Sequence, residues 1–349
     1  MAAIFTAGEL TPLKRLGFDD EAVPPWVMVP KNGTRNVNLK DGDQLSLQIR
    51  ALWSPGGSSV VTFKEKFRDP LLGRSIELTG IGPGTALLEA RDANNNQLQA
   101  TLEINVKERR TLSVCCCFVV DKSLRRSSAG MGESTTMIEG ANLIYLPQAN
   151  IELSRRNSYA VRLPFDMPRG VPVDLPAFEA PRQWYRPTPG PLPCIASQPP
   201  APRRAWGSGG CLPEESQGSL SPQNFQALRK YQMLCHILAW VDSTTDYTFF
   251  FVSHLDSGGG PFITRAFTPS YNNSSVLVNA SIIPSANSYG LVLAHELGHY
   301  LLTPSVLDIR GHSNGKHDLM QERPGHEDLK IPKDQANYMN SSGCQYILL

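Results

Sequence analysis

The sequence predicts two domains, an N-terminal all-β sandwich followed by an α+β domain, and three observations favour this division. Short strand-like runs separated by turn residues fill residues 23–108. Residues 109–349 open with a long apolar strand, a helix and a second strand, in β-α-β order. An apolar helix late in the chain carries two histidines four residues apart. At 349 residues the chain is long enough for two hydrophobic cores.

Residues 1–22 lack apolar periodicity, so we expect an N-terminal arm there. In residues 23–108, Asp43–Trp53 alternates apolar and polar side chains, which is typical of a half-buried strand. The other predicted strands are Trp26–Val29, Val60–Phe63, Ser75–Thr79, Thr85–Ala90 and Leu98–Val106. Turn residues at Gly80–Gly84 and Asn94–Asn96 separate them, as in an antiparallel sandwich.

Three stretches of this region, Ile76–Thr85, Ala90–Asn94 and Leu102–Val106, resemble bacterial Ig-like domains. The resemblance implies a spacer or adhesive module, and the alternative is a stability partner for the next domain. The sequence leaves both interpretations open.

The second domain begins after a charged junction, Lys107–Arg110. Leu112–Val120 is apolar throughout, so we expect a strand that is buried on both faces. The further predicted elements are the helices Thr135–Tyr145, Gln223–Val241 and Lys333–Ser341, and the strands Asn150–Leu153, Tyr247–Val252, Ile263–Phe267 and Ser275–Asn279. The stretch Ser274–Asn279 is either the edge of a cleft that pairs with an extended peptide or an ordinary core strand.

The run Ala294–Tyr300 contains the pattern H-E-x-x-H inside Tyr289–Leu302, which the sequence predicts as a helix. Residues four apart share a helical face, so the imidazoles of His295 and His299 converge on one point. Two neutral imidazoles on a rigid helix form half of a Zn²⁺ site. Glu296 can then take a proton from a zinc-bound water. The alternative is a surface helix with two chance histidines, which the specific motif and its context disfavour.

Five of the seven histidines lie between His295 and His326, so the third ligand is expected downstream of this helix. Gly311-His312-Ser313, followed by Leu319-Met320, resembles the metzincin zinc peptidases of the matrixin type. In that family a third histidine follows a glycine turn, and a methionine turn lies beneath the metal. The resemblance spans residues 109–349, and its specific part is 295–320. It implies His295, His299 and His312 as zinc ligands, Glu296 as the general base and Met320 as the methionine of the turn.

The chain departs from the family in one respect, because the family runs H-E-x-x-H-x-x-G-x-x-H without a break. Here His312 lies thirteen residues after His299 instead of six, which we interpret as a seven-residue insertion, Pro304–Arg310. The third ligand therefore stays open. His312 is the first choice and His317 the nearest rival. A carboxylate would make the site resemble that of thermolysin or the aspzincins, and the candidates are Asp308, Asp318, Glu322 and Glu327. Met320 is otherwise an ordinary core residue.

Residues 164–222 hold 14 of the 28 prolines and form a proline-rich insertion. A surface insertion is the favoured interpretation. The alternative is a functional loop, such as a lid or a latency segment in which the Cys211 thiolate reaches the zinc. Cys194 and Cys211 could pair in an oxidising compartment. Cys115, Cys116 and Cys117 point to alternating faces of a strand, so we expect buried apolar residues rather than a metal site.

These observations predict a zinc metalloendopeptidase that acts on a protein or peptide substrate. The alternatives are a zinc amidase acting on cell-wall peptides, and an adhesion or binding protein with an inert peptidase domain, against which the intact Glu296 argues. The net charge of +1 gives no indication of a nucleic-acid partner. No apolar run approaches the roughly 20 residues of a membrane span.

Residues 1–12 show no secretory signal pattern. A zinc peptidase joined to an Ig-like domain without such a signal resembles bacterial toxin effectors. We therefore expect export by a specialised secretion machine, with the cytoplasm as the alternative location. The partners expected of such an effector are a secretion-machine component and an immunity or inhibitor protein.

Overall fold

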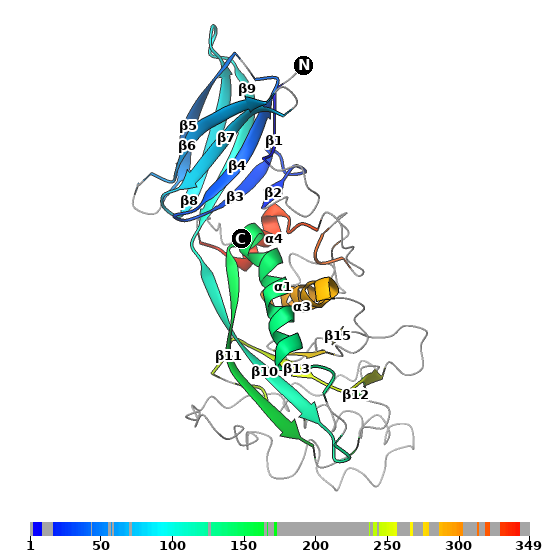
Figure 1. Cartoon of the computed structure of the whole chain (residues 1–349). Helices are drawn as coiled ribbons and strands as arrows, with labels where there is room; N and C mark the ends of the chain where they lie inside the picture. The colour runs from blue at the N-terminus through cyan, green and yellow to red at the C-terminus, as the bar shows by residue number, and fades with distance from the viewer. Residues whose placement is uncertain are drawn as a thin grey trace, which may run out of the picture. The chain divides into compact units, whose positions relative to one another are not determined.

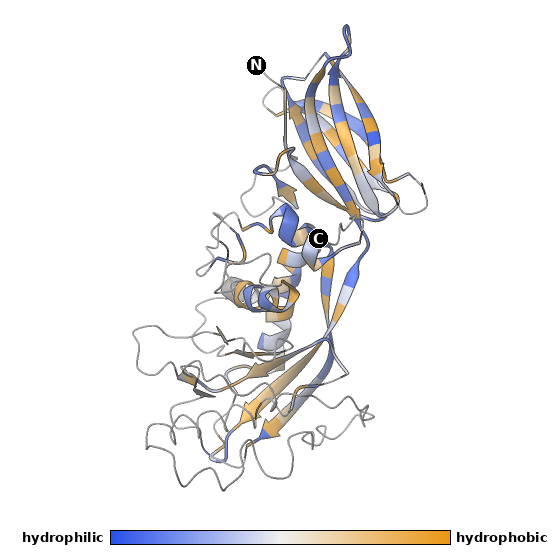
Figure 2. Ribbon diagram, turned by 180° about the vertical axis from the view of Figure 1, so that it is seen from behind, coloured by the Kyte–Doolittle hydropathy of each residue, from blue (hydrophilic) through white to orange (hydrophobic). Residues whose placement is uncertain are grey.

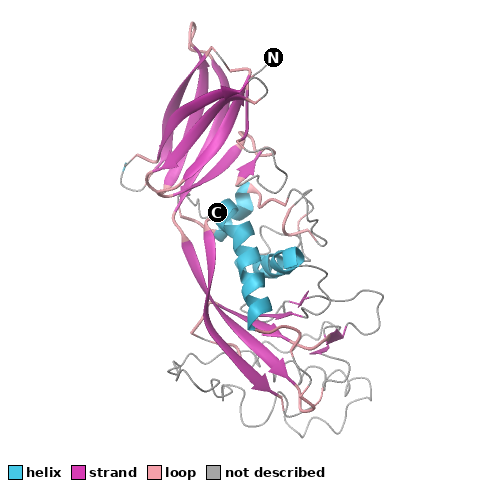
Figure 3. Cartoon of the chain, viewed as in Figure 1, coloured by secondary structure: helices cyan, strands magenta, loops and turns pink. Residues whose placement is uncertain are grey.

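The structure is a computed structural model and is composed mainly of strands (Figures 1 and 3). The residues that it describes are 3–8, 17–42, 44–54, 57, 59–69, 72–124, 127–163, 166, 171–172, 237, 240–242, 244–256, 266–267, 275–278, 286–302, 313, 318–321 and 329–342. The chain divides into two compact units. The first comprises Met1–Thr111, Ala141–Glu152 and Gly298–Leu349, and the second comprises Leu112–Gly140 and Leu153–Leu297. The first unit therefore contains the predicted sandwich together with the last part of the chain.

The sandwich has a four-stranded sheet in the order β1-β4-β7-β6 and a five-stranded sheet in the order β2-β3-β9-β8-β5. Its strands are β1 (Ile4–Ala7), β2 (Phe18–Asp19), β3 (Trp26–Pro30), β4 (Thr34–Lys40), β5 (Leu45–Trp53), β6 (Val61–Asp69), β7 (Gly73–Gly80), β8 (Gly84–Asp92) and β9 (Leu98–Lys107). All strands that the sequence predicts in residues 23–108 are present. The sequence does not predict β4, because Val37 and Leu39 are its only apolar residues.

Residues 1–22, which the sequence predicts as an arm, contribute two short strands. β1 pairs with β4, with Ile4 opposite Lys40, and β2 pairs with β3. Phe5 and Phe18 are buried in the sandwich core. Strands this short cannot show an alternating pattern, so their pairing depends on the neighbouring strands rather than on local sequence.

Side chains from both sheets form one core between them. In β7 and β8 the apolar core residues stand at alternate positions, Ile76 and Leu78 in β7, then Ala86, Leu88 and Ala90 in β8. Figure 2 shows the same alternation as orange and blue bands along the strands. All the buried residues of this cluster lie between Phe5 and Val106, so the sandwich has a hydrophobic core of its own. Burying each valine, leucine or isoleucine side chain there stabilises the fold by about 1.5–3 kcal/mol.

A second five-stranded sheet has the order β11-β10-β13-β16-β15. Its strands are β10 (Arg110–Val120), β11 (Ile151–Arg162), β13 (Tyr247–Phe251), β15 (Ala266–Phe267) and β16 (Ser275–Val278). β13 runs parallel to both β10 and β16, and β15 is antiparallel to β16. Every residue of Cys115–Cys117 and Phe249–Phe251 is completely buried, as expected of inner strands covered on both faces. β12 (Val171–Pro172) and β14 (Leu255–Asp256) form a separate two-stranded parallel pair.

Helices that lie within the described residues accompany these strands: α1 (Met131–Ala149), α3 (Ala286–Leu301) and α4 (Lys333–Met339). α1 extends beyond the predicted Thr135–Tyr145 at both ends, and most of the predicted helix Gln223–Val241 lies outside the described residues. α1 and α3 approach closely at two glycines, because a Cβ placed on Gly140 would lie 2.8 Å from the Cα of Gly290. Among the described helices, none combines the length and apolarity that a bilayer crossing requires.

Candidate functional site

Helix α3 presents the H-E-x-x-H residues in a mostly buried stretch. His295 is only 8% exposed, and its neighbours Ala294 and Leu297 are completely buried. Glu296 and His299 are half-buried, so they retain access to solvent. The spacing of four residues places both imidazoles on one helical face. A packed helix therefore holds the two predicted ligands and the predicted general base in fixed positions.

Met320 packs against this helix beside the second histidine. A Cβ placed on Gly298, the residue before His299, would overlap the Met320 sulfur and lie 3.0 Å from its Cε atom. Met320 is completely buried. A larger residue than glycine at position 298 would therefore displace the methionine side chain. The residue predicted for the methionine turn thus lies in contact with the predicted zinc helix.

The carboxylate of Asp318 closes the turn that carries Met320. Its Oδ1 atom accepts a hydrogen bond from the Met320 backbone N–H at 2.8 Å, and its Oδ2 atom accepts one from Nε2 of Gln335 in α4 at 2.7 Å. Asp318 is 1% exposed, and this burial raises its pKa, while hydrogen bonds from Ser313, Met320 and Gln335 act in the opposite direction. Both carboxylate oxygens are thus engaged in holding the turn, which argues against Asp318 as a zinc ligand.

Ser313 is attached to the same turn, because its backbone N–H donates to the Met320 carbonyl at 2.8 Å. Ser313 directly follows His312, the first choice for the third ligand. His312 lies outside the described residues, and so do His317, Asp308, Glu322 and Glu327. Within the described ranges, no three His, Cys, Asp or Glu side chains are grouped to hold a metal ion. The structure therefore describes two predicted ligands, His295 and His299, and the backbone next to the third.

The strand before α3 is not the edge of its sheet. β16 pairs with β13 on one side and with β15 on the other, where Val278 lies opposite Ala266 and Leu277 opposite Phe267. Of the two interpretations of Ser274–Asn279, the inner strand is the one observed, and β15 is the outermost strand on that side among the described residues. The sequence could not distinguish them, because apolar alternation does not report which strand lies outermost.

The three consecutive cysteines of β10 are free thiols and are completely buried. Burial raises the pKa of all three, to about 11 for Cys116. A buried thiol with a raised pKa is a poor nucleophile and a poor metal ligand. The prediction that these cysteines are small buried residues is confirmed. Cys194 and Cys211 lie outside the described residues.

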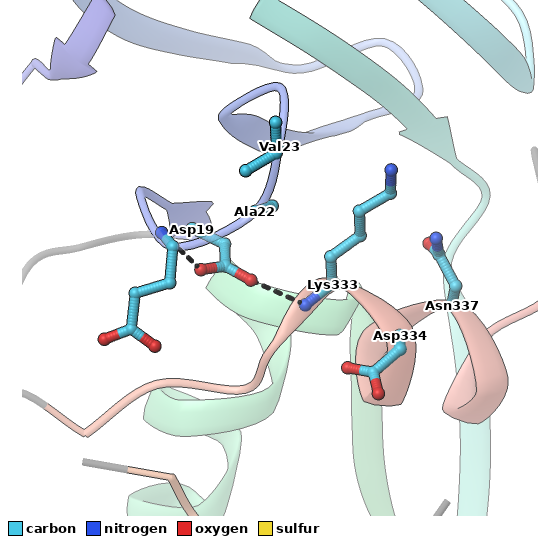
Figure 4. Close-up of a pocket in the computed structure, with 7 residues that line it drawn as sticks. Asp19, Ala22, Val23, Lys333, Asp334 and Asn337 are labelled. Carbon is cyan, nitrogen blue, oxygen red and sulfur yellow. Dashed lines mark hydrogen bonds between the residues drawn. The ribbon is translucent and has the colours of Figure 1, made fainter. Parts of the chain in front are cut away.

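An open pocket lies between β2 and α4, away from the H-E-x-x-H residues (Figure 4). Its lining residues are Asp19, Glu21, Ala22, Val23, Lys333, Asp334 and Asn337. Asp19 is a buried residue of this lining, and its carboxylate accepts a hydrogen bond from the Lys333 backbone N–H at 3.0 Å. This contact could not be predicted from local sequence, because the two residues are 314 positions apart. The buried charges beside this pocket tie β2 to the C-terminal part of the chain.

No protein-family model and no curated protein matches the chain. Among solved structures, it is similar to the titin domains Z1Z2 in complex with telethonin, with 15% identity and a TM-score of 0.18 over 34% of this chain and 58% of that chain. It is also similar to a chimeric titin Z1Z2 functionalized with a KLER exogenous peptide from decorin, with 15% identity and a TM-score of 0.17 over 34% of this chain and 57% of that one. The chain thus spans less than two thirds of either relative, and the low TM-scores carry no conclusion about fold or function.

Proposed function

We propose that the chain is a zinc-dependent metallopeptidase of the metzincin type that hydrolyses peptide bonds in proteins. One observation carries the proposal: Met320 packs against Gly298 on the helix that bears H-E-x-x-H. A chance pair of histidines on a surface helix would not require a buried methionine against the same helix. The β-α-β opening of the domain and the strand just before α3 agree with it.

The donor groups fit zinc. His295 and His299 supply two neutral imidazoles from one face of a packed helix, which suits a borderline-soft ion that prefers nitrogen and sulfur ligands. His312, next to the anchored Ser313, would complete three protein ligands. Zinc bound there would make water a better nucleophile and polarise the substrate carbonyl.

Glu296 performs the proton transfers in this proposal. It follows His295 directly and is half-buried, so its carboxylate can face both a water molecule and a substrate. Glu296 accepts a proton from the attacking water and then delivers it to the nitrogen of the leaving amine. The helix, packed on one side by Met320, keeps this carboxylate in position while the proton moves.

Zinc content and substrate range test the proposal. The full chain should bind close to one equivalent of zinc and cleave casein, and a chelator should abolish cleavage until zinc is restored. Protein that holds zinc but hydrolyses only peptidoglycan fragments would instead be an amidase. Protein that cleaves neither substrate would support a binding role.

A further inference from the structure

Lys330 is a cation in a buried position, with only 3% of its surface exposed. Its Nζ atom lies 2.7 Å from Oε2 of Glu21 and 3.5 Å from Oδ1 of Asp19. A buried ammonium group needs such partners, because little water is left to solvate it. Asp19 belongs to β2, the outer strand of the five-stranded sheet of the sandwich. The ion pair therefore attaches residue 330 to the sandwich.

The first residue of α4 is attached to the same sheet. The Lys333 backbone N–H donates to Oδ2 of Asp19 at 3.0 Å (Figure 4). The Lys333 Nζ atom lies 2.5 Å from Oε2 of Glu103, which belongs to β9. One carboxylate from each of two strands of the sandwich thus holds the beginning of α4.

The other end of α4 is held by buried polar groups. Lys107, the last residue of β9, is completely buried, and its Nζ atom donates to the Asn340 carbonyl at 2.7 Å. The side-chain amide of Asn340 donates to the Glu108 carbonyl at 2.9 Å. Residues 329–342 are therefore fixed to the sandwich at both ends of the helix.

This segment also holds the methionine turn. The Leu319 backbone N–H donates to the Lys330 carbonyl at 3.0 Å, and Asp318 and Lys330 form a parallel β-bridge. Gln335 of α4 binds the Asp318 carboxylate. The two residues before Met320 are thus tied to a segment whose own position depends on the charges of the sandwich.

We propose that the sandwich is an integral support of the histidine helix, with Asp19 and Lys330 as positioning residues. The ion pair acts on Met320 through Leu319 and Asp318, and Met320 acts on Gly298 by direct packing. The sandwich therefore contributes to the metal site itself and is more than a spacer or adhesive module. The effect on zinc rests on the proposed function, whereas the support of the turn does not.

The test uses the full chain with Lys330→Met, Asp19→Asn and the double variant. Lys66→Met is the control, because it removes a partly exposed ion pair with Glu77, at 2.9 Å, between β6 and β7 in the four-stranded sheet of the sandwich. Hydrogen exchange of the metal-free protein is measured for peptides covering residues 318–321, α3 and β8. Zinc affinity is measured by competition with a chelator, and the visible absorption of the Co²⁺-substituted protein reports the ligand geometry.

Each single variant should exchange about tenfold faster at residues 318–321 and in α3, while β8 stays protected. Zinc affinity should fall by about tenfold, in the range seen when groups that orient metal ligands are removed, and the Co²⁺ spectrum should change. The double variant should be less than additive, because each single variant already removes the contact between Asp19 and Lys330. Lys66→Met should alter none of these values.

Unchanged exchange at residues 318–321 and α3 in both single variants would overturn the proposal. If Lys330→Met does not fold, Asp19→Asn decides, because it keeps the shape of the side chain. Wild-type protein that binds no zinc, with faster exchange in the variants, would refute the proposed function and leave the support intact. Wild-type protein that binds zinc, with unaltered exchange in the variants, would agree with the proposed function and refute the support of the turn by the sandwich.

Discussion

The side chain of Met320 occupies the space that any side chain on Gly298 would need. The turn and helix α3 therefore meet with the methionine directly against the helix backbone. Methionine suits such a position, because its unbranched, polarizable side chain adapts to an irregular surface. Gly298 stands between the two histidines in sequence, so the contact supports the part of the helix that carries the proposed metal ligands.

Gly298→Ala should destabilise the protein, because the added methyl group overlaps the Met320 sulfur. Overpacking of this kind costs about 1–3 kcal/mol, and chemical denaturation would measure it. Adding Met320→Ala should be less than additive, since it frees the space that the new methyl group needs. Gly132→Ala in α1 is the control, because a Cβ there meets nothing within 4 Å. A Gly298→Ala variant as stable as Gly132→Ala would contradict the packing described here.

His312→Ala should lose most of the bound zinc, whereas His317→Ala should retain it. The reason is that Ser313, next to His312, is anchored to the turn that packs against α3. Zinc content after dialysis, measured by atomic absorption, separates the two histidines. Full zinc in His312→Ala together with loss in His317→Ala would move the third ligand to His317.

Glu89 should make the sandwich sensitive to acid. Its pKa is lowered, first by the hydrogen bond from Arg91 and then by that from Arg50. A carboxylate with a lowered folded-state pKa contributes stability that is complete above its ordinary value of 4.5 and is lost as the pH falls through the folded value. Glu89→Gln should therefore be less stable at neutral pH and lose less stability below pH 4.5. Denaturation of metal-free protein between pH 7 and 3 checks this, and parallel curves for both proteins would refute it.

Cys116 should resist alkylation in the folded protein. Burial raises its pKa to about 11, so at pH 8 only about one thiol in a thousand is ionised. Iodoacetamide labelling followed by peptide mapping should show slow modification of Cys116 in buffer and rapid modification in denaturant. Similar rates in both conditions would mean that β10 is exposed.

The sequence predicts the elements that have a strong local pattern. The strand Leu45–Trp53 alternates apolar and polar residues, and the apolar run at Leu112–Val120 needs burial on both faces, so both could be located from sequence alone. The spacing of His295 and His299 places them on one face of a helix once the helix is known. β1 and β2 are too short to show any pattern, and their pairing depends on the strands beside them.

The contacts that join the sandwich to the end of the chain could not be predicted. Asp19 and Lys330 are 311 residues apart, and an ion pair at such a separation leaves no local pattern. Lys107 belongs to the charged junction between the two predicted domains, and it is completely buried and donates to the Asn340 carbonyl. Its long side chain fits this position only because the tertiary structure supplies an acceptor.

The most direct test of the proposed function compares wild-type protein with Glu296→Gln for bound zinc and for casein cleavage. Glu296 carries protons without holding the metal, so the variant should keep close to one equivalent of zinc and lose about 100-fold or more of the cleavage rate. Glu296→Gln that still cleaves casein at the wild-type rate, or wild-type protein that binds no zinc, would contradict the account.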